Sequence, residues 1–184
     1  MAVGELIKTS REVQVTEIPS GYQGTLPAGS EVRIIQTLGG NYTVMTSTGQ
    51  MVRIASADAD AIGETPAPPP PPVQGADPNA PFNETAVWDQ LKTVYDPEIP
   101  VNIVELGLIY ECKATPAQEG GNRVDIRMSL TAPGCGMSDV LKRDVEQKIA
   151  GLPGVREVHV EVVFDPPWTP ERMSDAAKLQ LGIL

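Results

Sequence analysis

Hydrophobic positions follow a short, strand-like rhythm in the first third of the chain. Before residue 63, runs rich in β-branched residues alternate with turns that contain Gly, Pro and Ser. The runs that we interpret as strands are Val13–Val15, Glu31–Gln36, Tyr42–Thr46 and Met51–Ile54. Because the turns between them are tight, the pattern predicts a compact antiparallel meander, which we expect to form a small SH3-like β-barrel. A short helical turn is expected at Ser56–Ile62.

Beyond residue 82 the apolar spacing indicates helices as well as strands. Apolar residues recur every three or four positions over 83–95, where Asn83 can cap the start, so we predict an amphipathic helix there. A second helix is predicted over 137–149 and is expected to end at Gly151. Its apolar face is made of Met137, Leu141, Val145 and Ile149. A last short helix, capped by Thr169 or by Ser174, is expected to run toward Leu181.

Three segments of this second half alternate between apolar and polar residues, as strands do. They are 108–113, 124–130 and 158–164, and the first two should pair antiparallel across the turn at 118–122. The alternation places Cys112 with Leu108 and Tyr110 on the core side, whereas His159 is expected on the solvated side. The element order αββαβα therefore predicts an α+β domain with a small three-stranded sheet.

A proline-rich stretch separates the two patterns. Residues 64–81 contain eight prolines and almost no large apolar residue, so they cannot bury a core. Such a stretch is typical of a semi-rigid, partly polyproline II linker. We therefore expect a small β-barrel-like domain at 1–63, a Pro-rich linker at 64–81 and an α+β domain at 82–184.

Composition and charge narrow the classes of function. The chain has 14 Lys and Arg against 24 Asp and Glu, a formal charge of −10, so we do not expect it to bind nucleic acid. No apolar run approaches the roughly 20 residues that cross a bilayer, and Glu5 interrupts the start, so we expect a soluble, cytoplasmic protein. Reduced cytosolic thiols then make Cys112 and Cys135 free cysteines.

Three segments carry candidate chemistry. Cys135 lies within 131–137, where a strand gives way to a helix, and the unpaired amides at the start of that helix favour a thiolate. The alternative is an ordinary strand-to-helix connection. The second segment, 96–100 with 105–107 behind it, brings Asp96 and Glu98 to a loop edge, where they could bind a cation, act as acid and base, or simply form an Asp-Pro turn. The third, 165–168, suggests only a packed corner at Trp168.

The topology suggests that these segments meet. Asp96 and Glu98 leave the first helix and enter the first strand, while Thr131 leaves that strand's antiparallel partner. We expect Asp96, Glu98, Thr131 and Cys135 to line one pocket, provided that the segment 100–105 folds back along the sheet. The alternative is that the two acids only cap backbone amides of the loop.

Four ordered motifs in this half resemble a known family. They are Asp96-Pro97-Glu98-Ile99-Pro100, Glu105-Leu106-Gly107-Leu108-Ile109-Tyr110, Leu130-Thr131-Ala132-Pro133-Gly134-Cys135, and Asp165-Pro166-Pro167-Trp168 with Met173-Ser174. Together they resemble the iron-sulfur assembly domain formerly classed as a domain of unknown function, over about 83–184. The β-rich front end resembles the SufT-type members in particular. The resemblance implies a protein that helps to mature iron-sulfur proteins, with Cys135 as its exposed cysteine beside Thr131, Asp96 and Glu98.

Ligand chemistry limits what this resemblance can mean. A protein-bound iron-sulfur cluster usually takes about four thiolate-type ligands, and this chain has two cysteines with no Cys-x-x-Cys pair. A transient cluster held by Cys135 would therefore be shared between two protomers with small thiols, or handed to a client apoprotein. The chain could also be an adaptor that docks client and scaffold proteins. We favour a non-enzymatic adaptor or transient carrier. Its expected partners are scaffold or carrier proteins, client apoproteins and, in a homodimer, a second copy of the chain.

Two other classes of function stay open at this stage. The first is an enzyme that uses Cys135 as nucleophile with Asp96 or Glu98 as base, although cysteine catalysis generally recruits an imidazole and the single histidine, His159, is expected on the solvated face of a strand. The second is an accessory subunit of a multicomponent aromatic-acid oxygenase, which the resemblance also permits.

Overall fold

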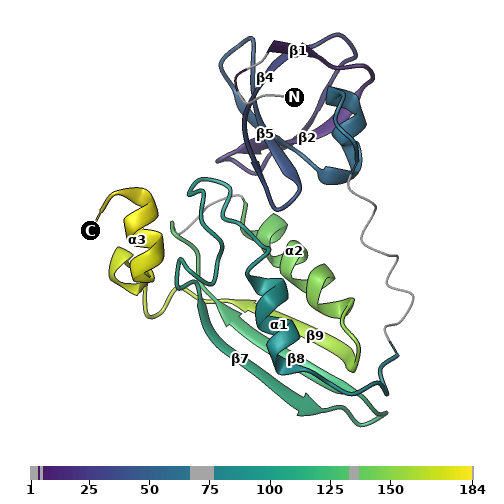
Figure 1. Ribbon diagram of the computed structural model, residues 1–184, viewed down its shortest axis with the longest axis vertical. Helices are drawn as coiled ribbons and strands as arrows, with labels where there is room; N and C mark the ends of the chain where they lie inside the picture. Colours follow the sequence, from purple (N-terminus) through teal and green to yellow (C-terminus); the bar gives the residue numbers. More distant parts are fainter. Residues whose placement is uncertain (1–3, 5, 67–76, 133–136, 184) are drawn as a thin grey trace. The chain divides into compact units, whose positions relative to one another are not determined.

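The computed structural model describes residues 4, 6–66, 77–132 and 137–183 (Figure 1). Two compact units make up the chain, Met1–Pro70 and Pro71–Leu184, and each has its own hydrophobic core. The domain and linker boundaries expected from the sequence stay predictions. No helix among the described residues is long and apolar enough to cross a membrane.

The first unit is a six-stranded antiparallel sheet followed by one 3₁₀ helix, η1, at Ser56–Ile62, where the sequence predicted a helical turn. The strand order is β1-β4-β5-β6-β2-β3. The strands are β1 (Leu6–Lys8), β2 (Val13–Ile18), β3 (Gln23–Leu26), β4 (Glu31–Leu38), β5 (Asn41–Thr46) and β6 (Met51–Ile54). The four strands expected from the sequence are present, whereas β1 and β3 were not predicted, because both are short and β3 has little apolar alternation.

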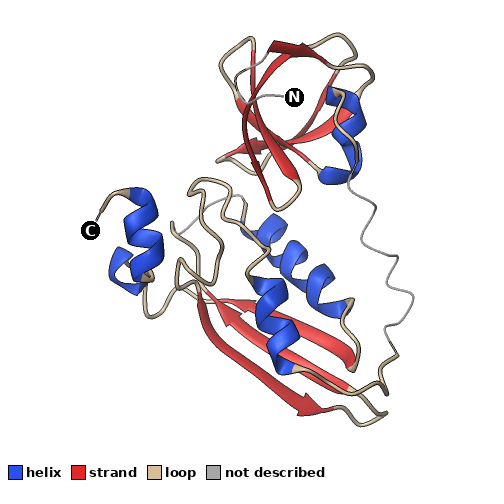
Figure 2. Cartoon of the chain, in the orientation of Figure 1, coloured by secondary structure: helices blue, strands red, loops and turns tan. Residues whose placement is uncertain are grey.

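The second unit is mixed α+β, as the sequence predicted (Figure 2). Its elements are α1 (Glu84–Leu91), β7 (Ile109–Pro116), β8 (Asn122–Met128), α2 (Ser138–Ala150), β9 (Val155–Val162), η2 (Pro170–Arg172) and α3 (Asp175–Leu181). The sheet order is β7-β8-β9; β7 and β8 form the expected antiparallel hairpin, and β8 and β9 are parallel because α2 crosses over between them. Helices α1 and α2 cover one face of this sheet.

The core of the second unit lies between the two helices and the sheet. The apolar face of α2 is buried as predicted, and the alternate residues of β8 meet it from the sheet. Their side chains are Leu141, Val145 and Ile149 from α2, and Val124, Ile126 and Met128 from β8. Asn83 caps α1 by accepting a 3.0 Å hydrogen bond from the Thr85 amide, and Ser174 caps α3 through the Ala177 amide.

Three details of the sequence prediction were wrong, each for a local reason. The first helix ends at Leu91 rather than at Tyr95, because Val94 turns into the core from a non-helical segment whose spacing imitates a helix. A bulge between Ile109 and Glu111 breaks the expected alternation in β7, so Ile109 packs with Cys112 against the core in place of Tyr110. Strand β9 ends before Phe164, which is 47% exposed.

Residues 77–81, at the end of the expected linker, and the adjoining Phe82 contact the rest of the second unit. The Gly154 amide donates a 3.0 Å hydrogen bond to the Asp77 carbonyl, and the Phe82 side chain packs against the core. A Cβ atom on Gly121 would lie 2.6 Å from the Pro78 carbonyl oxygen, so the two backbones touch where φ of Gly121 is +76°.

Candidate functional site

Two side chains, Asp96 and Asn102, each form a turn of the same kind in the loop after α1. Asp96 accepts hydrogen bonds of 2.9 Å from the amides of Glu98 and Ile99 through one carboxylate oxygen. The side-chain oxygen of Asn102 likewise accepts hydrogen bonds from the amides of Val104 and Glu105, at 3.1 and 2.9 Å. These turns, with the Ile103 amide bonded to the Val94 carbonyl, fold the loop back on itself before β7 begins.

The second carboxylate oxygen of Asp96 faces Thr131, which follows β8. Thr131 Oγ1 lies 3.5 Å from Asp96 Oδ2, at the long limit of a hydrogen bond. Only 5% of Asp96 is exposed, and this burial raises the pKa of its carboxyl group, although the Ile99 and Glu98 amides and the Thr131 hydroxyl act in the opposite direction. Asp96 is therefore the one buried carboxylate among the described residues of the loop.

A small pocket joins this loop to the start of α2. It is lined by Asp96, Pro97, Glu98, Leu130, Thr131, Met137 and Leu141. Three of the four residues expected to share a pocket thus lie along the same one, with Asp96 buried and Glu98 exposed. Cys135 lies outside the described residues, between Thr131 and Met137 in the sequence. The alternative role for the acids is present as well, because Asp96 does cap two backbone amides.

The motif around Glu105, Leu106 and Gly107 is tied to the end of the chain rather than to this pocket. The indole N–H of Trp168 donates a 2.7 Å hydrogen bond to the Leu106 carbonyl. The Ser174 hydroxyl donates to the Glu105 carboxylate, and the Ser174 amide donates to the Glu105 carbonyl at 2.9 Å. These pairings join the second and the last of the four motifs, which sequence reasoning had left unconnected.

This attachment requires a glycine at position 107. Its φ is +69°, and a Cβ atom there would lie 2.2 Å from the Arg172 carbonyl oxygen. The Arg172 guanidinium carbon in turn lies 4.0 Å from the centre of the Tyr110 ring, and the Tyr110 hydroxyl donates to the Pro166 carbonyl at 2.9 Å. Tyr110, displaced from the core by the bulge, therefore belongs to the same attachment.

The remaining titratable candidates among the described residues do not line this pocket. Cys112 is half-buried against the core, and burial raises the pKa of its thiol to about 11. His159 is exposed on β9. Within residues 4, 6–66, 77–132 and 137–183, no group of three or more His, Cys, Asp or Glu side chains is placed to hold a metal ion.

Comparisons with known proteins agree with the motifs. The model of the family described as "Iron-sulfur cluster assembly protein" matches residues 84–162. An Fe-S protein maturation auxiliary factor of Porphyromonas gingivalis is 43% identical over 51% of this chain and 86% of its own length. SufT, an Fe-S protein maturation auxiliary factor of Staphylococcus aureus, is 40% identical over 49% of this chain and 98% of its own. A DUF59 domain from Bacillus anthracis, known from a crystal structure, is 40% identical in sequence to this chain. The match covers 55% of this chain and 92% of that domain's chain, with a TM-score of 0.48. This chain belongs to the iron-sulfur cluster assembly protein family.

Proposed function

We propose that this protein is a maturation factor for iron-sulfur proteins, which acts as an adaptor or transient carrier and delivers clusters, iron or sulfur to client apoproteins through Cys135. The names of its relatives support the maturation role. The observation that carries the residue assignment is the pocket in which Asp96 and Thr131 meet beside Met137. We place its activity in the cytoplasm, where thiols stay reduced.

The covalent chain limits how far Cys135 can be from this pocket. Met137 lines the pocket and is two residues beyond Cys135, so the two Cα atoms are at most about 7 Å apart. Thr131, which precedes Cys135 in the sequence, lines the same pocket. A Cys135 thiolate, together with the Asp96 carboxylate and the Thr131 hydroxyl of the pocket, would supply the sulfur and oxygen donors that iron accepts.

The cluster would be cargo rather than a permanent part of the chain. Two cysteines cannot supply the four thiolate-type ligands of an ordinary cluster, and Cys112 packs against the core of the second unit. The other ligands would come from the donor, the client, small thiols or a second protomer. In this role Asp96, Glu98 and Thr131 bind and orient the cargo or the client, and the protein is not an enzyme.

We assign the first unit to partner docking. Its short antiparallel strands and separate core support a small SH3-like barrel, joined through the proline-rich segment to the part that carries the pocket. A docking module on a semi-rigid spacer would raise the local concentration of a scaffold or client near Cys135.

An anaerobic transfer assay tests the function. A reconstituted scaffold supplies cluster to an apo-enzyme that needs one, and activation of that enzyme is followed with and without this protein. We expect the wild type to accelerate activation, Cys135→Ser to abolish the acceleration, and Cys112→Ser to retain it if circular dichroism shows a folded protein. Acceleration by Cys135→Ser equal to the wild type would remove the thiol from the mechanism.

Asp96→Asn separates chemistry from turn formation in the same assay. An asparagine keeps the acceptor oxygen that the Glu98 and Ile99 amides need, as Asn102 shows in the neighbouring turn, but it removes the charge. Loss of acceleration in a folded Asp96→Asn protein would assign the charge to cargo or client binding. Full acceleration would leave Asp96 as a structural residue.

A further inference from the structure

Strand β9 forms one margin of the sheet in the second unit. One of its edges pairs with β8, and within the described part of the second unit no strand pairs with the other. Because the Val163 amide bonds to the Met128 carbonyl, the odd-numbered residues direct their backbone groups toward β8. The N–H and C=O groups of Val158, Val160 and Val162 therefore point outward from the free edge.

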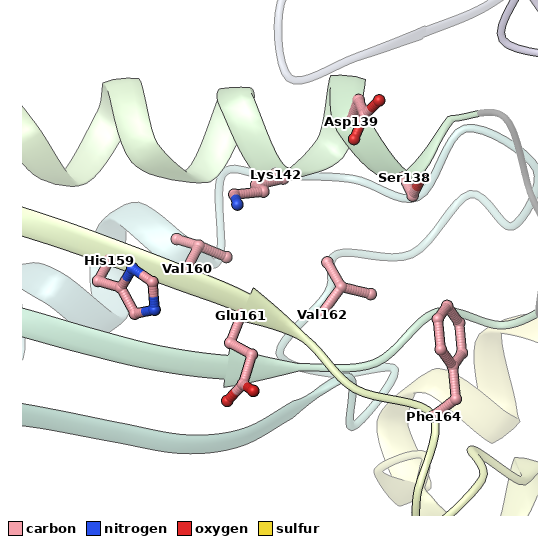
Figure 3. A pocket seen from close by; sticks show the side chains of 8 residues that line it. All are labelled: Ser138, Asp139, Lys142, His159, Val160, Glu161, Val162 and Phe164. Atoms are coloured by element: carbon pink, nitrogen blue, oxygen red, sulfur yellow. The ribbon is translucent and has the colours of Figure 1, made fainter.

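A groove runs along this edge (Figure 3). Val160 and Val162 point toward α2, whereas His159 and Glu161 point to the opposite face of the sheet. The lining residues are Ser138, Asp139, Lys142, His159, Val160, Glu161, Val162 and Phe164. The groove thus offers an added strand both backbone partners and an apolar side beneath α2.

The face of the sheet opposite α1 and α2 carries two rows of charged and polar side chains that run across the strands. In one row Lys113, Asp125 and His159 lie side by side, and in the next row Glu111, Arg127 and Glu161 do. Arg127 reaches Glu161 at 3.2 Å and Glu111 at 3.9 Å. We call these two rows the charge rows; both end at β9.

An antiparallel copy of β9 centred on Val160 joins both charge rows to those of the second copy. Centred on Val160, it sets His159 opposite Glu161 of the second copy in both directions, and Val158 opposite the second Val162. Centred on His159, it would set Glu157 opposite Glu161, and centred on Glu161 it would set the two Glu161 carboxylates face to face. Like charges directly opposite each other destabilise a strand pair, whereas opposite charges stabilise it.

We propose that the protein forms a two-fold symmetric dimer in which β9 pairs with β9 of a second copy, centred on Val160. The three outward-facing valines make the hydrogen-bonded pairs, and the sheet becomes continuous across both copies. Each charge row then runs on through the partner as Asp125, His159, Glu161, Arg127, so that the His159 imidazole lies between two carboxylates. The valine side chains of each copy enter the groove under α2 of the other.

This dimer keeps the two pockets apart. Ser138, at the start of α2, lies at the Phe164 end of the groove (Figure 3), and antiparallel pairing puts the two copies of that end at opposite ends of the joined strands. The proposal therefore does not depend on a cluster shared between protomers, and its failure would leave the proposed delivery function untouched.

Sedimentation and light scattering on the full chain test the assembly. We expect a mass that approaches twice 19.6 kDa as the concentration rises from micromolar toward millimolar. His159→Glu places two carboxylates opposite each other and should weaken dimerisation about tenfold, whereas His159→Gln, at the same exposed site, should change it less than about threefold. A monomer at all concentrations would overturn the proposal.

Disulfide trapping tests the register. His159 and Glu161 of the second copy would form a non-hydrogen-bonded pair, in which Cα atoms lie close enough for a disulfide. In a Cys135→Ser background, we expect the double variant His159→Cys, Glu161→Cys to give a covalent dimer under mild oxidation, while each single variant does not. Cross-linking of either single variant as efficient as that of the double would show another register and overturn the assignment.

Discussion

The indole N–H of Trp168 donates its hydrogen bond to the Leu106 carbonyl across 62 residues of sequence. Leu106 is fully buried, and it lies between Glu105 and Gly107, which contact Ser174 and Arg172. The loop that carries Asp96 is therefore held at its far end by the last segment of the chain. This attachment, rather than the pocket, accounts for the residue types in two of the four motifs.

Trp168→Phe should destabilise the second unit by about 1–2 kcal/mol, because the ring is largely kept while a buried carbonyl loses its donor. Urea unfolding followed by circular dichroism measures this. Tyr22→Phe, which removes a hydroxyl from a 71% exposed side chain, is the control and should stay within about 0.5 kcal/mol of the wild type. An unchanged midpoint for Trp168→Phe would show that the hydrogen bond does not matter.

Gly107→Ala should be considerably more costly than Gly182→Ala. Both glycines have nearly the same φ, +69° and +70°, but a Cβ atom at Gly182 meets nothing within 4 Å, whereas at Gly107 it collides with the Arg172 backbone. We expect the difference in unfolding free energy to be at least about 2 kcal/mol. Equal losses would mean that backbone strain alone, not the close approach, requires the glycine.

Asp96→Asn should change how stability depends on pH. Burial raises the pKa of Asp96 in the folded state above its ordinary value of 3.8, so the folded protein binds this proton more tightly than the unfolded chain does. The resulting stabilisation is complete below pH 3.8 and is lost as the pH rises through the raised pKa. Asp96→Asn should therefore gain stability relative to the wild type as the pH rises.

Urea midpoints from about pH 4 to about pH 7 measure this difference. Asp89→Asn, at an exposed site on α1, controls for the loss of one negative charge. A constant difference between Asp96→Asn and the wild type across this range would contradict the raised pKa.

Cys112 should be almost unreactive toward iodoacetamide at neutral pH. With its pKa raised to about 11, it holds about a hundredfold less thiolate than a cysteine at its ordinary value of 9.0. Peptide mass spectrometry of Cys135→Ser measures this thiol alone, and unfolding in urea should restore labelling. Rapid labelling of the folded variant would place Cys112 at the surface.

Cys112→Ser should cost about 1–3 kcal/mol of stability.

A fragment that begins at Asp77 should be more stable than one that begins at Asn83. The longer fragment keeps the Asp77–Gly154 hydrogen bond and the Phe82 side chain on the core, which together contribute about 2–3 kcal/mol. Thermal unfolding of the two fragments gives the comparison, and limited proteolysis of the full chain should cut ahead of Asp77. Equal stability would mean that residues 77–82 add nothing to the stability of the second unit.

Apolar periodicity was sufficient to predict most of the second unit, because its helices and strands bury one face each. It overextended the first helix, since Val94 reaches the core at helical spacing without helical backbone, and it could not detect the bulge that moves Tyr110 off the core. Topology alone suggested that Asp96 and Thr131 meet. The Trp168–Leu106 contact was out of reach, because its acceptor is a backbone carbonyl, which every residue has.

The long separations in this attachment also bear on the speed of folding. The Trp168–Leu106 and Ser174–Glu105 bonds close loops of 62 and 69 residues, and contacts so distant in sequence form late, because chain entropy must be lost before they contribute. The loop around Asp96 can therefore reach its final shape only after residues 168–174 have docked onto it. On a ribosome, the pocket would be among the last parts of the second unit to mature.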